Sequence, residues 1–256
     1  MQPGRPLSFP EDVMTNDFHS RILAIDIGGT NLKAALLSED GRILGDPLRC
    51  ATPPEATPAL MLEALRALIA PLGDYERISI GFPGAIRRGI ILTAPNIGTE
   101  AWHGTDFGAL ATACFGRPAR LANDAMLHGL GVITGEGIEL VLTLGTGMGF
   151  SLFRGGIPAP QIEFGRHTAG EAPTYDDFVG DAALRQLGME AWKGRVKETI
   201  SRCAALVNFD ILHLGGGNAR HFEAGELPAG VRLAVNAAGL TGGMKLWSPE
   251  MDVIFR

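Results

Sequence analysis

The sequence predicts an α/β protein whose two halves follow a similar plan. Short apolar runs that suit strands alternate with segments of helical periodicity, which is typical of helices packed against a mixed sheet. A glycine turn between two apolar runs occurs at Gly28 and recurs at Gly145, so we interpret the second half as a copy of the first. Hydrophobic residues make up 46% of the 256-residue chain, enough to fill a buried core.

The first half is predicted to form a strand meander, a helix and a further strand. Gly28-Gly29-Thr30 joins two apolar runs, which predicts a hairpin. Apolar residues then recur at helical spacing from Leu60 to Leu68, and Pro71 ends the pattern. The strands expected here are 21–27, 32–37, 42–44 and 77–81.

The second half repeats this order around its own glycine turn. A long amphipathic helix is expected at 191–209, with one apolar stripe made up of Val196, Ile200, Cys203, Ala204 and Val207. Asn218 follows a glycine run and is expected to start a helix. The other elements expected are strands 120–122, 139–144, 150–153 and 211–214 and helices 124–130 and 236–247.

Charge and composition favour small-molecule partners. The net charge of −6 and the pI of about 5.5 give no overall positive field for nucleic acid or an anionic membrane. No apolar run approaches the ~20 residues of a membrane helix, and Met1–Ser20 lacks the apolar stretch of a signal peptide, so we expect a cytoplasmic protein. The three cysteines form no CxxC pair, which argues against a disulfide framework and a cysteine-bound zinc.

The first glycine turn is a candidate phosphate site. Gly28 and Gly29 allow the backbone to approach a ligand closely, and Thr30 adds a hydroxyl. Asp26 is placed to hold Mg²⁺, through water, and Lys33 adds a positive charge nearby. A tight hairpin without any ligand explains the same glycines.

Two later glycine turns offer similar chemistry. One contains Gly145, Thr146 and Gly147, with Thr143 just before it, and the other is Gly215-Gly216-Gly217 after a buried strand. Neither is a dinucleotide fingerprint, because no GxGxxG motif opens a helix, and no GxxxxGK motif occurs. Each turn taken alone is also explained as a plain loop.

Polar residues lie between the first two turns. Asn96 follows a proline, and Asn123-Asp124 stands at an expected helix start. An Asp at such a place is most often a helix cap, so the dipeptide alone does not establish a catalytic carboxylate.

Considered together, six motifs point to one family. In order they are Ile25-Asp26-Ile27-Gly28-Gly29-Thr30, Gly81-Phe82-Pro83-Gly84, Pro95-Asn96, Asn123-Asp124-Ala125, Leu144-Gly145-Thr146-Gly147-Met148-Gly149 and Leu214-Gly215-Gly216-Gly217. This series resembles the ROK family of sugar kinases, and within it the polyphosphate glucokinase branch. The resemblance covers 21–247 and implies the actin-like ATPase fold, hexokinase/ribonuclease H-like, in which two lobes close on a cleft.

The resemblance also implies a domain division, a donor and an assembly. We expect a flexible tail at 1–20, an N-terminal small lobe at 21–118 to which a C-terminal helix at about 239–248 returns, and a C-terminal large lobe at 119–238. It implies Mg²⁺, ATP or inorganic polyphosphate as phosphoryl donor, and a homodimer. The first two glycine turns would bind the transferred phosphates, and the third would lie beside the adenosine.

Residue roles follow from the same resemblance. Asp124 becomes the base that accepts the proton of a sugar hydroxyl, and Asn96, Asn123 and Glu163 bind sugar hydroxyls. Glu163-Phe164-Gly165 resembles the family's Glu-Leu-Gly-His segment, but the fourth position is Arg166, with His167 one place later. Which of the two replaces the family histidine is open, and we expect His167 to contact the sugar. The cysteine-rich zinc motif of many relatives is missing, so no structural zinc is expected. Glu171 is a candidate for a second sugar-binding glutamate.

The resemblance implies a glucokinase-like enzyme that transfers the phosphoryl group to a hexose hydroxyl, with glucose as the expected acceptor, and alternatives to it remain at this stage. A non-catalytic ROK-type sugar regulator is one, although the short N-terminal segment does not suit a helix-turn-helix and Asp124 is retained. A kinase for mannose, fructose or N-acetylmannosamine is another, and an ATPase of the same superfamily without a sugar is a third. For polyphosphate, Arg87-Arg88 or Arg117 with Arg120 offers a basic groove, or simply surface charge.

Overall fold

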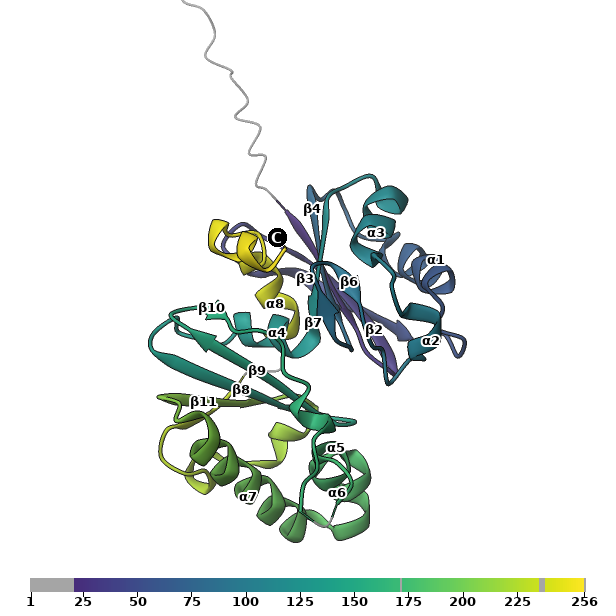
Figure 1. The fold of residues 1–256 in the computed structure, drawn as a ribbon. Helices are drawn as coiled ribbons and strands as arrows, with labels where there is room; N and C mark the ends of the chain where they lie inside the picture. Colours follow the sequence, from purple (N-terminus) through teal and green to yellow (C-terminus); the bar gives the residue numbers. More distant parts are fainter. Residues whose placement is uncertain (1–20, 171, 235–237, 256) are drawn as a thin grey trace, which may run out of the picture.

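The computed structural model describes residues 21–170, 172–234 and 238–255, which form two five-stranded sheets (Figure 1). The first has the order β3-β2-β1-β4-β7 and the second the order β10-β9-β8-β11-β12. In each sheet the middle strand pairs antiparallel with the strand that follows it in the chain and parallel with its other neighbour. The shared order and directions confirm that the second half repeats the first.

The strands are short, and the first two of the expected glycine turns lie between paired strands. The first sheet contains β1 (Ile22–Ile27), β2 (Asn31–Leu37), β3 (Ile43–Ala51), β4 (Arg77–Phe82) and β7 (Ala119–Asn123). The second contains β8 (Ile138–Leu144), β9 (Met148–Arg154), β10 (Ile157–Pro158), β11 (Ile211–Gly215) and β12 (Val231–Leu233). A separate small hairpin joins β5 (Ile86–Arg87) to β6 (Ile90–Ile91).

Helices cover the outer faces of both sheets. The outer helices are α1 (Pro58–Ile69), α2 (Thr99–Trp102), α3 (Phe107–Phe115), α5 (Tyr175–Val179), α6 (Asp181–Leu187) and α7 (Met189–Val207). Apolar residues of α1 and α3 pack on the first sheet in one core, and those of α5 and α7 pack on the second sheet in another. In α7 the expected stripe is buried at Val196, Ile200 and Cys203 and is joined by Trp192. The prediction was wrong for Ala204, which is exposed, and Val207 is only half-buried, because the last turn of the helix lies at the edge of the core. Each half therefore has its own hydrophobic core.

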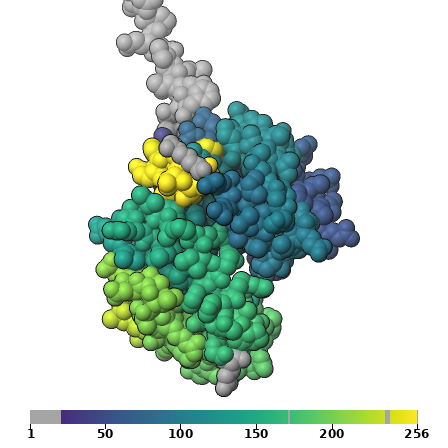
Figure 2. Space-filling view, viewed as in Figure 1, coloured from purple at the N-terminus to yellow at the C-terminus, as the bar shows by residue number. Residues whose placement is uncertain are grey.

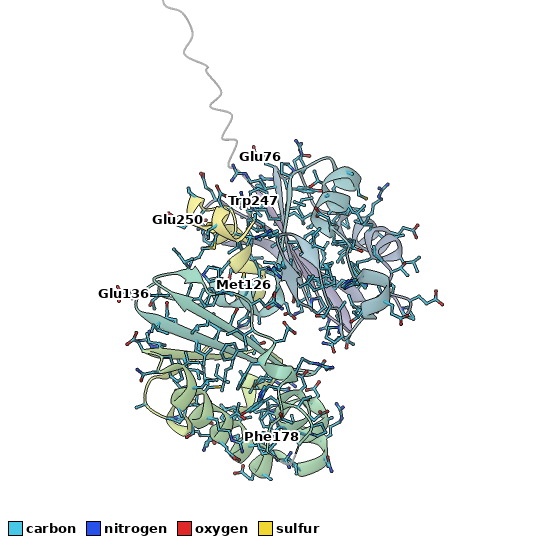
Figure 3. All side chains as sticks on the ribbon, in the orientation of Figure 1. Glu76, Met126, Glu136, Phe178, Trp247 and Glu250 are labelled. Carbon is cyan, nitrogen blue, oxygen red and sulfur yellow. The ribbon has the colours of Figure 1, made fainter. Side chains whose placement is uncertain are left out.

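Two helices form the layer between the sheets, as Figure 1 shows: α4 (Asp124–Leu130) and α8 (Ala238–Lys245). A third core joins Met126, Leu127 and Leu130 of α4 to Val141 and Phe153 of the second sheet. Met126, labelled in Figure 3, lies in this middle layer. On its other side α8 packs against β1, β2 and β4. The middle layer therefore connects the two halves.

Polar contacts fix the C-terminal segment to the first sheet. The buried Ser79 hydroxyl donates to the Gly243 carbonyl at 2.7 Å and accepts from the Trp247 indole at 2.9 Å. Arg120 donates to the Leu246 carbonyl, pairs with Asp252 at 2.7 Å and stacks on Trp247. The carboxylate of Asp252 therefore offsets the charge of Arg120, which makes this arginine less suited to a basic groove.

Most expected elements are present, and the differences have simple causes. Four short 3₁₀ helices occur among the described residues, at Phe164–Arg166, Gly217–His221, Ala224–Glu226 and Pro249–Ile254. Asn218 lies inside the second of these rather than at the start of an α-helix. β3 runs on to Ala51, well beyond the expected 42–44, because pairing with β2 continues past a bulge. The periodicity did not reveal α2, α3 or the β5-β6 hairpin.

The pairing of β7 bears on the lobe division. We expected the large lobe to begin at residue 119, but β7 pairs parallel with β4 as the edge strand of the first sheet. We therefore propose that the division follows Asn123, at the start of α4. The tail expected at 1–20 lies outside the described residues.

The structure also describes the state of the cysteines and the lengths of the helices. The three cysteines are free, Cys203 is buried, and burial raises the pKa of its thiol to about 12. Among the described residues, no helix has both the length and the apolar character needed to cross a membrane.

The crossing of α4 and α8 depends on a glycine. A Cβ at Gly242 would collide with the Leu127 carbonyl of α4, whereas a Cβ at Gly194, an exposed position of α7, would meet nothing within 4 Å. We expect Gly242→Ala to lower the free energy of unfolding by ~1–3 kcal/mol through overpacking. Gly194→Ala should raise it by ~0.5–1 kcal/mol, because alanine favours a helix interior. Urea denaturation of both variants is the measurement, and equal shifts would contradict the packing argument.

Candidate active site

A cavity of about 370 Å³ lies where the two halves meet. Figure 2 shows the surface of this junction, with the first half in blue and teal above the green second half. Most of the residues predicted from sequence line the cavity: Asp26, Gly28, Gly29, Lys33, Asn96, Asn123, Asp124, Thr143, Gly145, Thr146, Gly147, Glu163, Gly216 and Gly217. Three predicted residues, Thr30, His167 and Gly215, are not in its wall. The fold thus brings segments far apart in sequence to one place.

The first glycine turn connects β1 to β2. Asp26, the residue before the last of β1, lies directly opposite Lys33 of β2, and the Lys33 Nζ lies 3.0 Å from Asp26 Oδ2. A Cβ at Gly28 would come within 2.9 Å of the Asn31 carbonyl, so the turn needs glycine. Thr30 is exposed beyond the cavity wall, and its carbonyl accepts from the Thr52 amide. The turn places one carboxylate and one cation at the cavity.

The second glycine turn connects β8 to β9 and is held by a residue that the sequence patterns did not reveal. Asp176 Oδ1 accepts from the Met148 amide at 2.8 Å, and Cβ atoms at Gly147 or Gly165 would collide with its carboxylate. Asp176 lies in the first turn of α5, where acidic residues are common, so its sequence gave no sign of this contact. It positions the turn through the backbone.

Asn123 and Asp124, both candidates for the cap of α4 and for the cavity, have different roles in the structure. The Asn123 side chain caps α4 by accepting from the Met126 amide at 3.1 Å, and it donates to the Gly84 carbonyl at 3.2 Å. The helix cap is therefore Asn123, which leaves Asp124 facing the cavity with the Ala125 amide on its Oδ1 at 2.8 Å. Burial, with the charge of Asp26 and then that of Glu163, raises the pKa of Asp124 to about 7.

The segment with Glu163 forms the opposite wall. Glu163 and Arg166 line the cavity, and Arg166 Nη1 lies 3.6 Å from Asp176 Oδ2. His167 stacks on Phe164, with ring centroids 5.9 Å apart, and its Nδ1 lies 3.1 Å from the Thr168 carbonyl. The structure thus brings Arg166, and not the expected His167, to the cavity, because the 3₁₀ turn at Phe164–Arg166 directs the two side chains differently. Glu171 lies outside the described residues.

His128 is a further cavity residue that sequence reasoning missed. It lies one helical turn after Asp124 on α4, a spacing that puts both on one face. The side chain is buried, and burial lowers the pKa of its imidazole to about 4, so the ring is neutral near pH 7. Its Nε2 has no hydrogen-bond partner among the residues that the structure describes, and it packs against Gly215, where a Cβ would collide with it. This explains why Gly215 lies behind the wall rather than in it.

The donor set of the cavity suits a hard cation better than zinc. Asp26 offers a carboxylate beside Asp124, and oxygen ligands are those that Mg²⁺ prefers. Within the described ranges, no group of three or more His, Cys, Asp or Glu side chains is placed to hold a metal ion. The expectation of no structural zinc stays a prediction.

Comparison with known proteins assigns the chain to a family. The model of the ROK family matches residues 22–172. The chain belongs to the ROK family. This ROK protein is 28% identical to the polyphosphate glucokinase of Mycobacterium tuberculosis strain H37Rv over 235 residues. The match covers 85% of the chain and 88% of that enzyme. The match to the polyphosphate glucokinase of Mycobacterium leprae, also 28% identical, spans 61% of the chain but only 50% of that protein.

Solved structures of sugar kinases have a similar fold. A shorter match is to a kinase for a different sugar. The inorganic polyphosphate/ATP-glucomannokinase of Arthrobacter sp. strain KM is similar with a TM-score of 0.80 and 29% identity, covering 88% of this chain and 97% of that one. The Streptomyces griseus ROK glucokinase with glucose and AMPPNP has a TM-score of 0.72 at 21% identity over 89% and 99% of the two chains, which shows the fold alone. The N-acetylmannosamine kinase of Shigella flexneri is 47% identical over 72 residues, 28% of this chain and 24% of that protein. The ROK protein therefore has the actin-like ATPase fold.

The contact between His128 and Gly215 can be tested with substitutions that change the size of each side chain. Gly215→Ala should destabilise the ROK protein by ~1–3 kcal/mol, because the new methyl group collides with Nε2. His128→Ala removes the ring, so the double variant should be more stable than the sum of the single effects predicts. Thermal unfolding of the four proteins measures this coupling. Strict additivity would show that the two residues do not touch.

The raised pKa of Asp124 predicts a pH-dependent stability. Between 3.8 and about 7 the folded state binds more protons than the unfolded state, so this carboxyl favours folding at low pH and loses that effect as pH rises through about 7. Asp124→Asn should stabilise the fold near pH ~8 by at most ~4 kcal/mol, at ~1.36 kcal/mol per pKa unit, and by nothing near pH ~4. Denaturant titrations across this range, with exposed Asp74→Asn as control, measure it. A stability difference that does not change with pH would contradict the shift.

Proposed function

We propose that this ROK protein is a sugar kinase that transfers a phosphoryl group from ATP or inorganic polyphosphate to a hexose hydroxyl, with glucose as the first acceptor to test. One observation carries the proposal. Asp124, a carboxyl with a pKa of about 7, faces a cavity whose walls include both glycine turns. A base with a pKa near the working pH and two backbone cradles for phosphate are what phosphoryl transfer to an alcohol requires.

Each part of the cavity has a role in this proposal. Asp124 accepts the proton of the attacking hydroxyl, while Asn96, Asn123 and Glu163 orient the sugar through its other hydroxyls. The turns at Gly28 and Gly145 hold the donor phosphates, and Gly216 with Gly217 lies beside the rest of the donor. Mg²⁺ held through water by Asp26 would neutralise phosphate charge. In this scheme positioning and charge, rather than covalent chemistry, provide the rate.

Donor choice depends on the cations at the cavity. Lys33 and Arg166 line it, and each is already paired with a carboxylate, Asp26 and Asp176 respectively. A polyanionic donor would compete for these cations. Polyphosphate appears in the names of the Mycobacterium tuberculosis and Arthrobacter enzymes, so both donors belong in the proposal. The proposal also includes a cytoplasmic homodimer, which the family likeness implies.

A coupled phosphorylation assay tests the proposal directly. Purified protein is given glucose, mannose, fructose or N-acetylmannosamine, each with ATP or polyphosphate and Mg²⁺. Turnover in any combination supports the kinase and identifies both substrates. No turnover with sugar binding still detectable by calorimetry would favour a non-catalytic regulator instead.

Asp124→Asn tests the base. The amide keeps the shape and the hydrogen bond from the Ala125 amide but does not accept a proton, so we expect kcat to fall by ~10²–10⁴-fold while sugar affinity stays close to normal. In the unmutated protein kcat/KM should rise with pH through about 7 as the carboxyl loses its proton. Rates across the pH range measure both effects. Turnover by the variant at the unmutated rate would remove Asp124 from the mechanism.

A further inference from the structure

The side chain of Gln161 forms hydrogen bonds to both halves of the molecule. It lies between β10 and Glu163, in the second half. Its Nε2 donates to the Gly84 carbonyl at 3.0 Å and to Glu163 Oε1 at 2.6 Å, and its Oε1 accepts from the Ile86 amide at 3.0 Å. Gly84 and Ile86 follow β4 in the first half. Two of these three hydrogen bonds, those with Gly84 and Ile86, thus cross the junction beside the cavity.

These bonds fix the amide in one orientation. Both N–H groups of Gln161 face oxygen acceptors, and its oxygen faces a backbone N–H. Turning the amide over would set its oxygen against the Gly84 carbonyl and Glu163 Oε1, and would leave the Ile86 amide facing a second donor. The geometry therefore requires a primary amide at this place.

Gly84 connects this arrangement to the residue beside the base. Its carbonyl accepts from Gln161 and also from Asn123 Nδ2 at 3.2 Å, and Asn123 precedes Asp124. A Cβ at Gly84 would collide with the Thr93 carbonyl, so the backbone of the two segments packs closely there. Gln161 therefore links Glu163 to a packed point of the first half that also anchors the start of α4.

Glu163 needs such a support. Its side chain is exposed, and a free glutamate has several rotamers that a ligand must immobilise on binding. The short bond from Gln161 to Oε1 is charge-assisted and leaves Oε2 for a ligand. A carboxylate oxygen held in one place suits the hydroxyl groups of a polyol.

We propose that Gln161 is a positioning residue for the acceptor sugar, which holds Glu163 ready to bind sugar hydroxyls and ties the two lobes together across the cleft. This inference rests on the proposed function for its substrate class. Opening the cleft at this end breaks the bonds to Gly84 and Ile86, so release of the sugar and release of this tie occur together.

The test compares Gln161→Glu and Gln161→Ala with a matched control. Gln186→Glu makes the same charge change on exposed α6, away from the cavity. Gln161→Glu replaces the N–H donors with a carboxylate that faces Glu163 and the Gly84 carbonyl. Gln161→Ala removes the side chain that reaches them. We expect the sugar Kd by calorimetry, and the sugar KM, to rise by about tenfold or more in both variants, because a hydrogen bond to a charged group is lost. The donor KM should change by less than about twofold.

A second measurement reports on the hydrogen bond between Gln161 and Ile86 that joins the two halves. Hydrogen exchange at the Ile86 amide, which donates to Gln161, should be faster in Gln161→Ala and unchanged in Gln186→Glu. Gln161→Asn keeps the amide on a shorter side chain and should retain more sugar affinity than Gln161→Ala. Thermal unfolding confirms that each variant is folded.

The outcomes separate the two proposals. Sugar affinity within about twofold of normal in Gln161→Ala and Gln161→Glu would overturn the positioning role, and unchanged exchange at Ile86 would overturn the tie. If the unmutated protein binds no sugar, the proposed function fails, while exchange at Ile86 still decides whether Gln161 joins the lobes.

Discussion

The crossing of α4 and α8 between the two sheets is the contact on which the rest of the structure depends. At Gly131 and Gly242 the two helices approach so closely that a Cβ would collide with backbone of the other helix. This approach brings the ends of β1 and β8, and therefore both glycine turns, to opposite sides of one cavity. It also directs Asp124, the first residue of α4, into the space between them. The architecture thus makes the site by joining two similar units face to face.

Electrostatics of the cavity follow from that arrangement. Asp26, Asp124 and Glu163 come from three distant segments, and their mutual repulsion adds to burial in raising the pKa of Asp124. Lys33 and Arg166 stand at the same cavity but are paired with Asp26 and Asp176. Among the described residues neither Asp124 nor Glu163 has a cation partner, and Asp124 is the less exposed of the two. The charges are therefore distributed so that one group is suited to take up a proton while others hold the surrounding turns.

Contacts across the junction differ in kind between its two ends. At the middle layer they are apolar, with Met126, Leu127 and Phe153 in one core. At the Glu163 end they are the hydrogen bonds of Gln161 to Gly84 and Ile86. Hydrogen bonds that lie beside an open cavity exchange readily with water, whereas a buried apolar core does not. Motion between the halves is therefore expected to begin at the Glu163 end.

The sequence by itself determined most strands of the two sheets, the helices α1, α4, α7 and α8 and the internal repeat, because apolar periodicity and glycine turns are local signals. Asp26, Asp124 and Gly145 were predicted in this way, with their roles supplied by the family likeness. Tertiary structure alone decided that β7 completes the first sheet and that Asn123 rather than Asp124 caps α4. It also decided that Arg166 rather than His167 reaches the cavity, and it revealed Gln161, Asp176 and His128. Those outcomes depend on contacts between residues far apart in the chain and on the directions of individual side chains, which no local pattern encodes.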